Sequence, residues 1–163
     1  SGTGFTFLSS VLQQMGEQKG YEYLKKFKGQ VAQFTPSGFT PAQKAGAGEY
    51  LITVNFLADQ NLISLKGQKL VSTVYPNAGW SVVAISKMKN NANEDVAKAF
   101  IDYCLTKEAG EMISKTTHAI ACHPDVAPPA GSKPLKDLPL FKAYDFEKAG
   151  AAKQEMTDKF FGL

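Results

Sequence analysis

The feature that most constrains this chain is the alternation of helix-type segments with short β-branched runs. Apolar residues at helical spacing predict helices over 3–15, 21–31, 40–46, 59–68, 93–105, 106–114 and 145–160. Three runs rich in apolar and β-branched residues predict strands at 50–56, 70–75 and 80–86, and we expect the first of them to be buried. Because strands and helices alternate along the chain, we expect an α/β architecture.

A proline-rich stretch separates the last predicted helix from the rest of the chain. Five prolines fall between Pro124 and Pro139, and proline has no backbone N–H to donate to a helix or sheet. We therefore expect an irregular connection there. The apolar runs of the chain, such as 82–85, are far shorter than the roughly 20 residues needed to cross a bilayer.

The charged residues narrow the class of ligand. All 18 cationic side chains are lysines and the net charge is +3. A nucleic-acid reader commonly presents Arg for bidentate contacts, so we do not expect a nucleic-acid partner. A phosphate bound by this chain would be held by backbone N–H groups, hydroxyls or Lys.

Two cysteines and two histidines offer alternatives to a binding function. Cys104 and Cys122 form a disulfide or remain free, and we favour two buried free thiols because Cys104 falls on an apolar helix stripe. A zinc site from these cysteines with His118 and His123 matches no common spacing. A hydrolase would rely on Cys122-His123, His118 or Asp125, but adjacent residues on an extended segment point apart.

The first four residues have the composition of an anion-binding helix start. Ser1 can cap the helix or offer its hydroxyl, Gly2 lets an anion approach the backbone, and Thr3 adds a second hydroxyl. An ordinary N-cap that binds water is the alternative. Because no initiator Met or signal segment precedes Ser1, we expect the natural N-terminus to lie upstream, unless Ser1-Gly2 is a scar of tag removal. Ser37 and Gly38 lie at a second loop-to-helix junction, which either faces the same ligand site as Ser1 to Thr3 or is a plain type I turn.

Several stretches, in order, carry a resemblance to a known family. They are Ser1-Gly2-Thr3-Gly4-Phe5-Thr6-Phe7-Leu8, Thr35-Pro36-Ser37-Gly38 with Pro41-Ala42, Gly48-Glu49-Tyr50, Val74-Tyr75-Pro76, Ala97-Lys98-Ala99-Phe100-Ile101-Asp102 and Tyr144-Asp145-Phe146. Together they resemble the periplasmic binding proteins once grouped as ferric-iron binders, which include receptors for phosphonates and hexose phosphates.

The resemblance implies a type II periplasmic binding fold, in which two α/β lobes close on a ligand. Residues 1–75 would belong to the second lobe, 76–123 would return to the first, and 124–163 would complete the second. The chain would then cover most of the second lobe and part of the first. The N-terminal half of the same protein, which begins the first lobe, would be missing.

The same resemblance suggests further site residues. Hexose-phosphate members place a His-Asp pair after a strand and a Glu after the Tyr-Pro turn; here Asp59 remains, while Ala58 and the Trp80-Ser81 region replace the His and Glu. Asp59 would accept a hydrogen bond from a ligand or cap the next helix. Trp80, the single Trp, would supply an apolar wall or a cation-facing ring, or only pack.

The expected function is that of a non-catalytic receptor. It would bind a small anionic solute, such as a phosphonate or sugar phosphate, and deliver it to the membrane permease of an ABC transporter. We expect no cofactor, no metal and a periplasmic or extracellular location, with or without a lipid anchor on the full-length protein. The alternative of a ferric-iron binder is disfavoured, because Asn55-Phe56 stands where iron binders present adjacent tyrosines.

Overall fold

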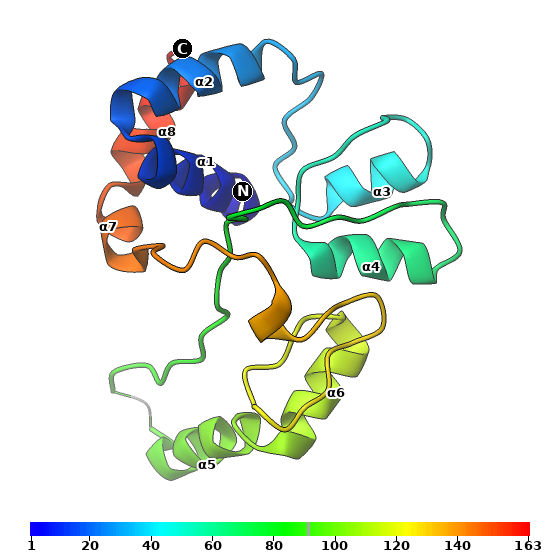
Figure 1. The fold of residues 1–163 in the computed structure, drawn as a ribbon. Coiled ribbons are helices and arrows are strands. Elements are labelled where there is room, and N and C mark those ends of the chain that lie inside the picture. Colours follow the sequence, from blue (N-terminus) through cyan, green and yellow to red (C-terminus); the bar gives the residue numbers. More distant parts are fainter. Residues whose placement is uncertain (91) are drawn as a thin grey trace. The chain divides into compact units, whose positions relative to one another are not determined.

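The computed structural model describes residues 1–90 and 92–163, and these form eight α-helices and one 3-10 turn (Figure 1). The helices are α1 (Gly2–Met15), α2 (Glu17–Lys28), α3 (Thr40–Gly46), α4 (Leu57–Leu65), α5 (Glu94–Cys104), α6 (Lys107–Thr117), α7 (Phe146–Ala151) and α8 (Lys153–Phe161), and the 3-10 turn η1 covers Leu135–Asp137. Each helix predicted from the sequence is present. The last predicted helix is two helices, which meet at Ala152.

The three segments predicted as strands are not strands in the described part of the chain. Residues 50–56, 70–75 and 80–86 contain no ladder, and Ala78 forms one isolated parallel bridge with Leu140. Leu51 is 101% exposed, so the expected burial of 50–56 was also wrong, and Val71 in the second segment is 99% exposed. Strand preference reflects packing against neighbouring strands, and the described residues supply none beside these segments. An α/β architecture therefore remains unconfirmed.

The chain divides into two compact units. Unit 1 comprises Ser1–Phe56, Thr73–Ser81 and Pro139–Leu163, and unit 2 comprises Leu57–Ser72 and Val82–Leu138. The division of the sequence into lobes near residues 75 and 123 stays a prediction.

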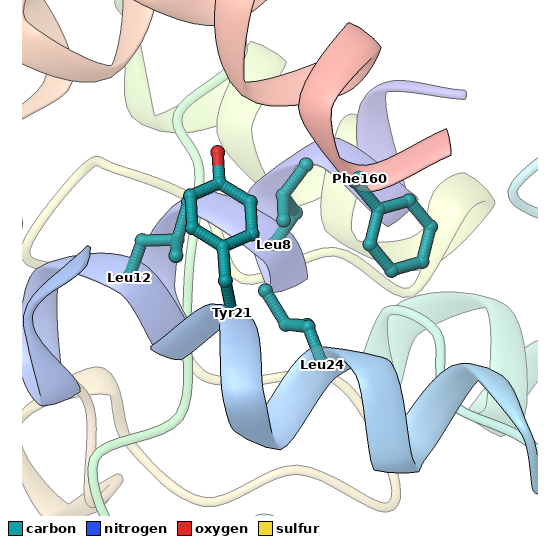
Figure 2. Close-up of a cluster of buried hydrophobic side chains, with 5 residues drawn as sticks. All are labelled: Leu8, Leu12, Tyr21, Leu24 and Phe160. Atoms are coloured by element: carbon teal, nitrogen blue, oxygen red, sulfur yellow. The ribbon is translucent and has the colours of Figure 1, made fainter. Parts of the chain in front are cut away.

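The core of unit 1 lies between α1, α2 and α8. Figure 2 shows its five buried side chains pointing toward one another, namely Leu8, Leu12, Tyr21, Leu24 and Phe160. Leu24 has no exposed surface, and burying a leucine contributes about 1.5–3 kcal/mol. Gly20 allows the close approach of α2, because a Cβ there would lie 2.8 Å from Leu12 Cδ2. This core fixes the direction of α1, whose first turn carries the candidate site.

In unit 2, α6 contacts both α4 and α5. The apolar side chains Val96 and Phe100 of α5 are 68% and 59% exposed. The helix forms because its residues favour it locally, whereas burial requires a second element, and α6 covers only part of α5. Both cysteines are free, with Cys104 partly buried and Cys122 exposed, so burial was wrongly expected for Cys122.

The proline-rich connection is irregular as predicted, apart from the single turn η1. Within the described residues, no helix has both the length and the apolar character that crossing a membrane requires.

Candidate functional site

The first turn of α1 presents backbone donors that the helix itself does not use. Ser1 caps the helix: its Oγ accepts a hydrogen bond from Gly4 N at 3.2 Å, and its carbonyl accepts one from Phe5 N at 3.1 Å. The N–H groups of Gly2 and Thr3 precede any intrahelical acceptor, as in the first turn of every α-helix. Gly2 is exposed and Thr3 is half-buried. The partial positive charge of the helix start favours an anion at these two N–H groups.

A pocket of about 390 Å³ opens at this helix end within unit 1. Gly2, Thr3 and Thr6 of α1 contribute to its lining. Much of the remaining lining is aromatic, and we call Trp80, Tyr144 and Phe146 the aromatic wall. Donors from a helix start and ring faces therefore share one pocket, which suits a ligand with an anionic group and an apolar part.

The rings of the aromatic wall pack edge to face. The centroids of Trp80 and Phe146 lie 4.9 Å apart at an interplanar angle of 90°, and those of Tyr144 and Phe146 lie 4.8 Å apart at 83°. The polar tips of two rings are already bonded within the protein. Trp80 Nε1 donates to Phe141 O at 3.0 Å, and the Tyr144 hydroxyl lies 2.5 Å from Ser9 Oγ. The wall consequently offers ring surface to the pocket more than hydrogen bonds.

The loop that carries Ser37 and Gly38 lies against Thr3. A Cβ on Gly38 would collide with Thr3 Oγ1 and lie 2.9 Å from Thr3 Cβ. Ser37 is exposed, and its Oγ accepts a hydrogen bond from Phe39 N at 3.2 Å. The hydroxyl proton of Ser37 is still free to be donated elsewhere. The helix that follows, α3, begins at Thr40 with Phe39 as N-cap.

The six predicted site residues fall in two groups. Gly2, Thr3 and Trp80 line the pocket, Ser1 caps the helix beside it, and Ser37 lies in the loop next to Thr3.

Asp59 belongs to unit 2, where it sits partly buried in the first turn of α4. Because α4 begins at Leu57, Asp59 is not the N-cap that we considered as its alternative role.

Sequence reasoning missed Thr6, Tyr144 and Phe146 as lining residues. Tyr144-Asp145-Phe146 was recognised as a shared stretch, but nothing in the sequence links it to α1, more than 130 positions away. Asp145 gave the one usable signal, because its side chain caps α7 by accepting from Lys148 N at 2.8 Å. A helix cap placed between two aromatic residues indicates a fixed local geometry.

The residues proposed for zinc or for hydrolysis form no such site in the described chain. No group of three or more His, Cys, Asp or Glu side chains gathers there to hold a metal ion. His123 Nδ1 accepts a hydrogen bond from Asp125 N at 3.2 Å, so this nitrogen faces its own backbone. Neither hypothesis gains support from this geometry.

The chain is similar to known proteins both in sequence and in fold. The family model described as bacterial extracellular solute-binding protein matches residues 1–149. An uncharacterized protein of Haemophilus influenzae is 34% identical over 158 residues, which cover 94% of this chain and 45% of that protein. The structure of the periplasmic binding protein AfuA from Actinobacillus pleuropneumoniae, with exogenous fructose 6-phosphate bound, is similar with a TM-score of 0.90 and 30% identity. That match covers 99% of this chain and 52% of AfuA, so the chain spans about half the length of both relatives.

Proposed function

The chain belongs to the family of bacterial extracellular solute-binding proteins, and from that premise we propose that it supplies the anion-binding part of a receptor for a small organophosphate or phosphonate. One observation carries the proposal: the unused N–H groups of Gly2 and Thr3 open into a pocket whose other lining is largely aromatic. A phosphate would accept hydrogen bonds from these N–H groups, while the carbon skeleton would lie against the rings.

The chemistry of the chain supports this assignment over other anion-binding modes. The sequence contains no Arg, so no guanidinium fork is available to grip a phosphate. Thr3 Oγ1 lies in the first turn of α1, and the Ser37 hydroxyl lies in the loop that contacts Thr3, so both are candidate side-chain donors. The bound fructose 6-phosphate in the AfuA structure provides a phosphate ester of the proposed class to test first.

The rest of the receptor is proposed from the relatives. Because the chain spans about half of their length, we infer that the second wall of the site comes from the remainder of the full-length protein. The chain would form most of the second lobe and part of the first in a type II fold. The receptor would act in the periplasm, with or without a lipid anchor, and hand its solute to the permease of an ABC importer.

We further propose that the protein is not catalytic. The pocket presents backbone amides, hydroxyls and rings, and neither the His118 nor the Cys122-His123 position is part of its lining. Iron is disfavoured for a chemical reason. Hard Fe³⁺ prefers anionic oxygen ligands such as phenolate, whereas the one phenol of the pocket, that of Tyr144, already bonds to Ser9.

Calorimetric titration of the full-length protein tests the proposed function. The ligands are fructose 6-phosphate, aminoethylphosphonate, inorganic phosphate and ferric citrate, and phosphatase-type turnover is followed in parallel. We expect saturable binding of at least one of the two organic anions, tighter than that of inorganic phosphate, and no turnover. Binding of ferric iron alone, or release of phosphate from the ester, would overturn the proposal.

A further inference from the structure

A stripe of polar side chains runs along one face of α1, buried at its two serines and exposed at Gln14. Ser9, Ser10, Gln13 and Gln14 stand at i and i+4 positions, and both serines have no exposed surface. Polar groups at such buried positions are costly unless they are hydrogen-bonded. Their partners lie in two remote segments of unit 1, and these two segments carry the aromatic wall.

The first connection joins Gln13 to the backbone of Asp145. Gln13 Nε2 donates to Asp145 O at 2.9 Å, and Asp145 N donates to Gln13 Oε1 at 2.8 Å. The side-chain amide of Gln13 thus bonds both the N–H and the C=O of Asp145, the same two groups that a neighbouring β-strand would bond. Asp145 is extended, with φ −94° and ψ 102°, so Tyr144 and Phe146 on either side of it point to the same face. Holding Asp145 therefore holds both rings.

The second connection joins the stripe to the segment before Trp80. Gln14 Nε2 donates to Asn77 O at 3.1 Å and to Ser10 Oγ at 2.8 Å. Gly79 packs directly on Ser10, because a Cβ there would lie 2.9 Å from Ser10 Cβ. The backbone that leads into Trp80 is seated on the same face of α1 that holds Asp145.

We propose that Gln13 is a positioning residue that sets the aromatic wall of the pocket, with Ser9 as its partner through Tyr144. The proposal rests on the proposed function in one respect, namely that the wall contacts the ligand. Edge-to-face packing depends on ring orientation, so freeing the backbone of Asp145 lets Phe146 move away from Trp80. Ligand contacts to the rings are then lost, while the N–H groups at the start of α1 remain in place.

The variant Gln13→Glu tests this role without changing side-chain length. Its carboxylate accepts from Asp145 N but has no proton to donate to Asp145 O, and its charge repels that carbonyl. Protonation restores one donor and one acceptor, and with them the pattern of the original amide. At neutral pH we expect affinity for fructose 6-phosphate about tenfold weaker than in the original protein, which corresponds to one lost hydrogen bond.

Trp80 provides a readout that needs no ligand, because it is the single Trp of the chain and its ring stands edge-on to Phe146. In ligand-free Gln13→Glu we expect a changed emission maximum and stronger acrylamide quenching at neutral pH. Both should return toward the original values as the pH falls below the usual pKa of a glutamate carboxyl. The original protein is measured at each pH for comparison. Full-length protein is used throughout, with any further Trp outside these 163 residues replaced by Phe.

Gln154→Glu is the matched control, because Gln154 lies exposed on α8 and, among the described residues, its side chain bonds within its own helix, at Asp158 Oδ1. It should leave the emission of Trp80 and the affinity unchanged. If Gln13→Glu does not fold, Gln13→Met takes its place, since it is uncharged, of similar length and removes both bonds to Asp145.

Unchanged Trp80 emission and quenching in the variant that folds would overturn the positioning role. The role would also be overturned if the Trp80 emission of Gln13→Glu differs at neutral pH but does not return to that of the original protein on acidification. Failure of the original protein to bind fructose 6-phosphate would count against the proposed ligand, and the ligand-free emission would still decide the role of Gln13.

Discussion

Gly38 offers a sharp test of how the site is assembled, because its surface is pressed against Thr3. Its φ lies outside the left-handed region that favours glycine, so alanine is compatible with the backbone. Any loss of stability in Gly38→Ala must then come from steric contact between the added methyl group and Thr3. The added methyl would collide with Thr3 Oγ1, lie 2.9 Å from Thr3 Cβ and touch Thr3 Cγ2 at 3.7 Å. Two of these contacts are too short, and the Cβ of Thr3 cannot rotate away.

Overpacking of this kind costs about 1–3 kcal/mol when the surroundings adjust in part. We expect Gly38→Ala to lower the free energy of unfolding by that amount in urea denaturation of the full-length protein. The same variant should weaken binding of fructose 6-phosphate, because Thr3 is pushed from its place at the helix start. In a Thr3→Gly background the colliding atoms are absent, so the cost of Gly38→Ala should fall below about 0.5 kcal/mol.

Gly29→Ala is the matched control. Gly29 also has a φ compatible with alanine, at −68°, and a Cβ there would make an ordinary contact of 3.5 Å with Lys26 O. This variant should stay within about 0.5 kcal/mol of the original protein. If Gly38→Ala proves as stable as Gly29→Ala and binds ligand equally well, the loop does not rest on Thr3 as described.

Three further predictions concern the core, the anion and pH. Leu24→Ala should destabilise the protein by about 2–5 kcal/mol in urea denaturation, because Leu24 is fully buried, whereas Leu65→Ala, at a 55% exposed position, should change little; equal effects would contradict the assigned core. Thr3→Val should weaken fructose 6-phosphate binding by about 1–3 kcal/mol in calorimetry, and unchanged affinity would remove Thr3 from the site. The Lys159 ammonium bonds Glu17 and lowers the pKa of that carboxyl in the folded protein. The pair therefore stabilises the fold at pH values above the unfolded pKa of Glu17. This stabilisation is lost as the pH falls through the lower pKa that Glu17 has in the folded protein. Glu17→Gln should therefore lose less stability on acidification than the original protein, and identical acid profiles would refute this.

The helices were predictable because their signals are local. Ser1 and Asp145 cap α1 and α7 through bonds to residues three positions later, and such bonds follow directly from residue type and spacing. The strand predictions failed, because β-branched residues form a strand only where a neighbouring strand pairs with them. Leu51 and Val71 have the residue type of a strand, but the described residues place no second strand beside them.

The candidate site divides in the same way. Ser1, Gly2 and Thr3 were identified from chain-local chemistry, and the structure places Gly2 and Thr3 in a pocket lining. Tyr144 and Phe146 were missed as lining residues. The bonds that hold their segment against α1 join Gln13 to Asp145, 132 positions apart in the sequence. Long-range side-chain bonds to backbone have no periodicity or spacing from which to infer them.

The central claim is that an anion binds at the start of α1. We would measure it most directly with ¹H–¹⁵N spectra of the full-length protein titrated with fructose 6-phosphate. The amide protons of Gly2 and Thr3 should shift downfield more than others, because they gain a charged acceptor, while the Trp80 indole N–H keeps its bond to Phe141 O and shifts less. Saturable binding that leaves Gly2 and Thr3 unshifted would contradict the account.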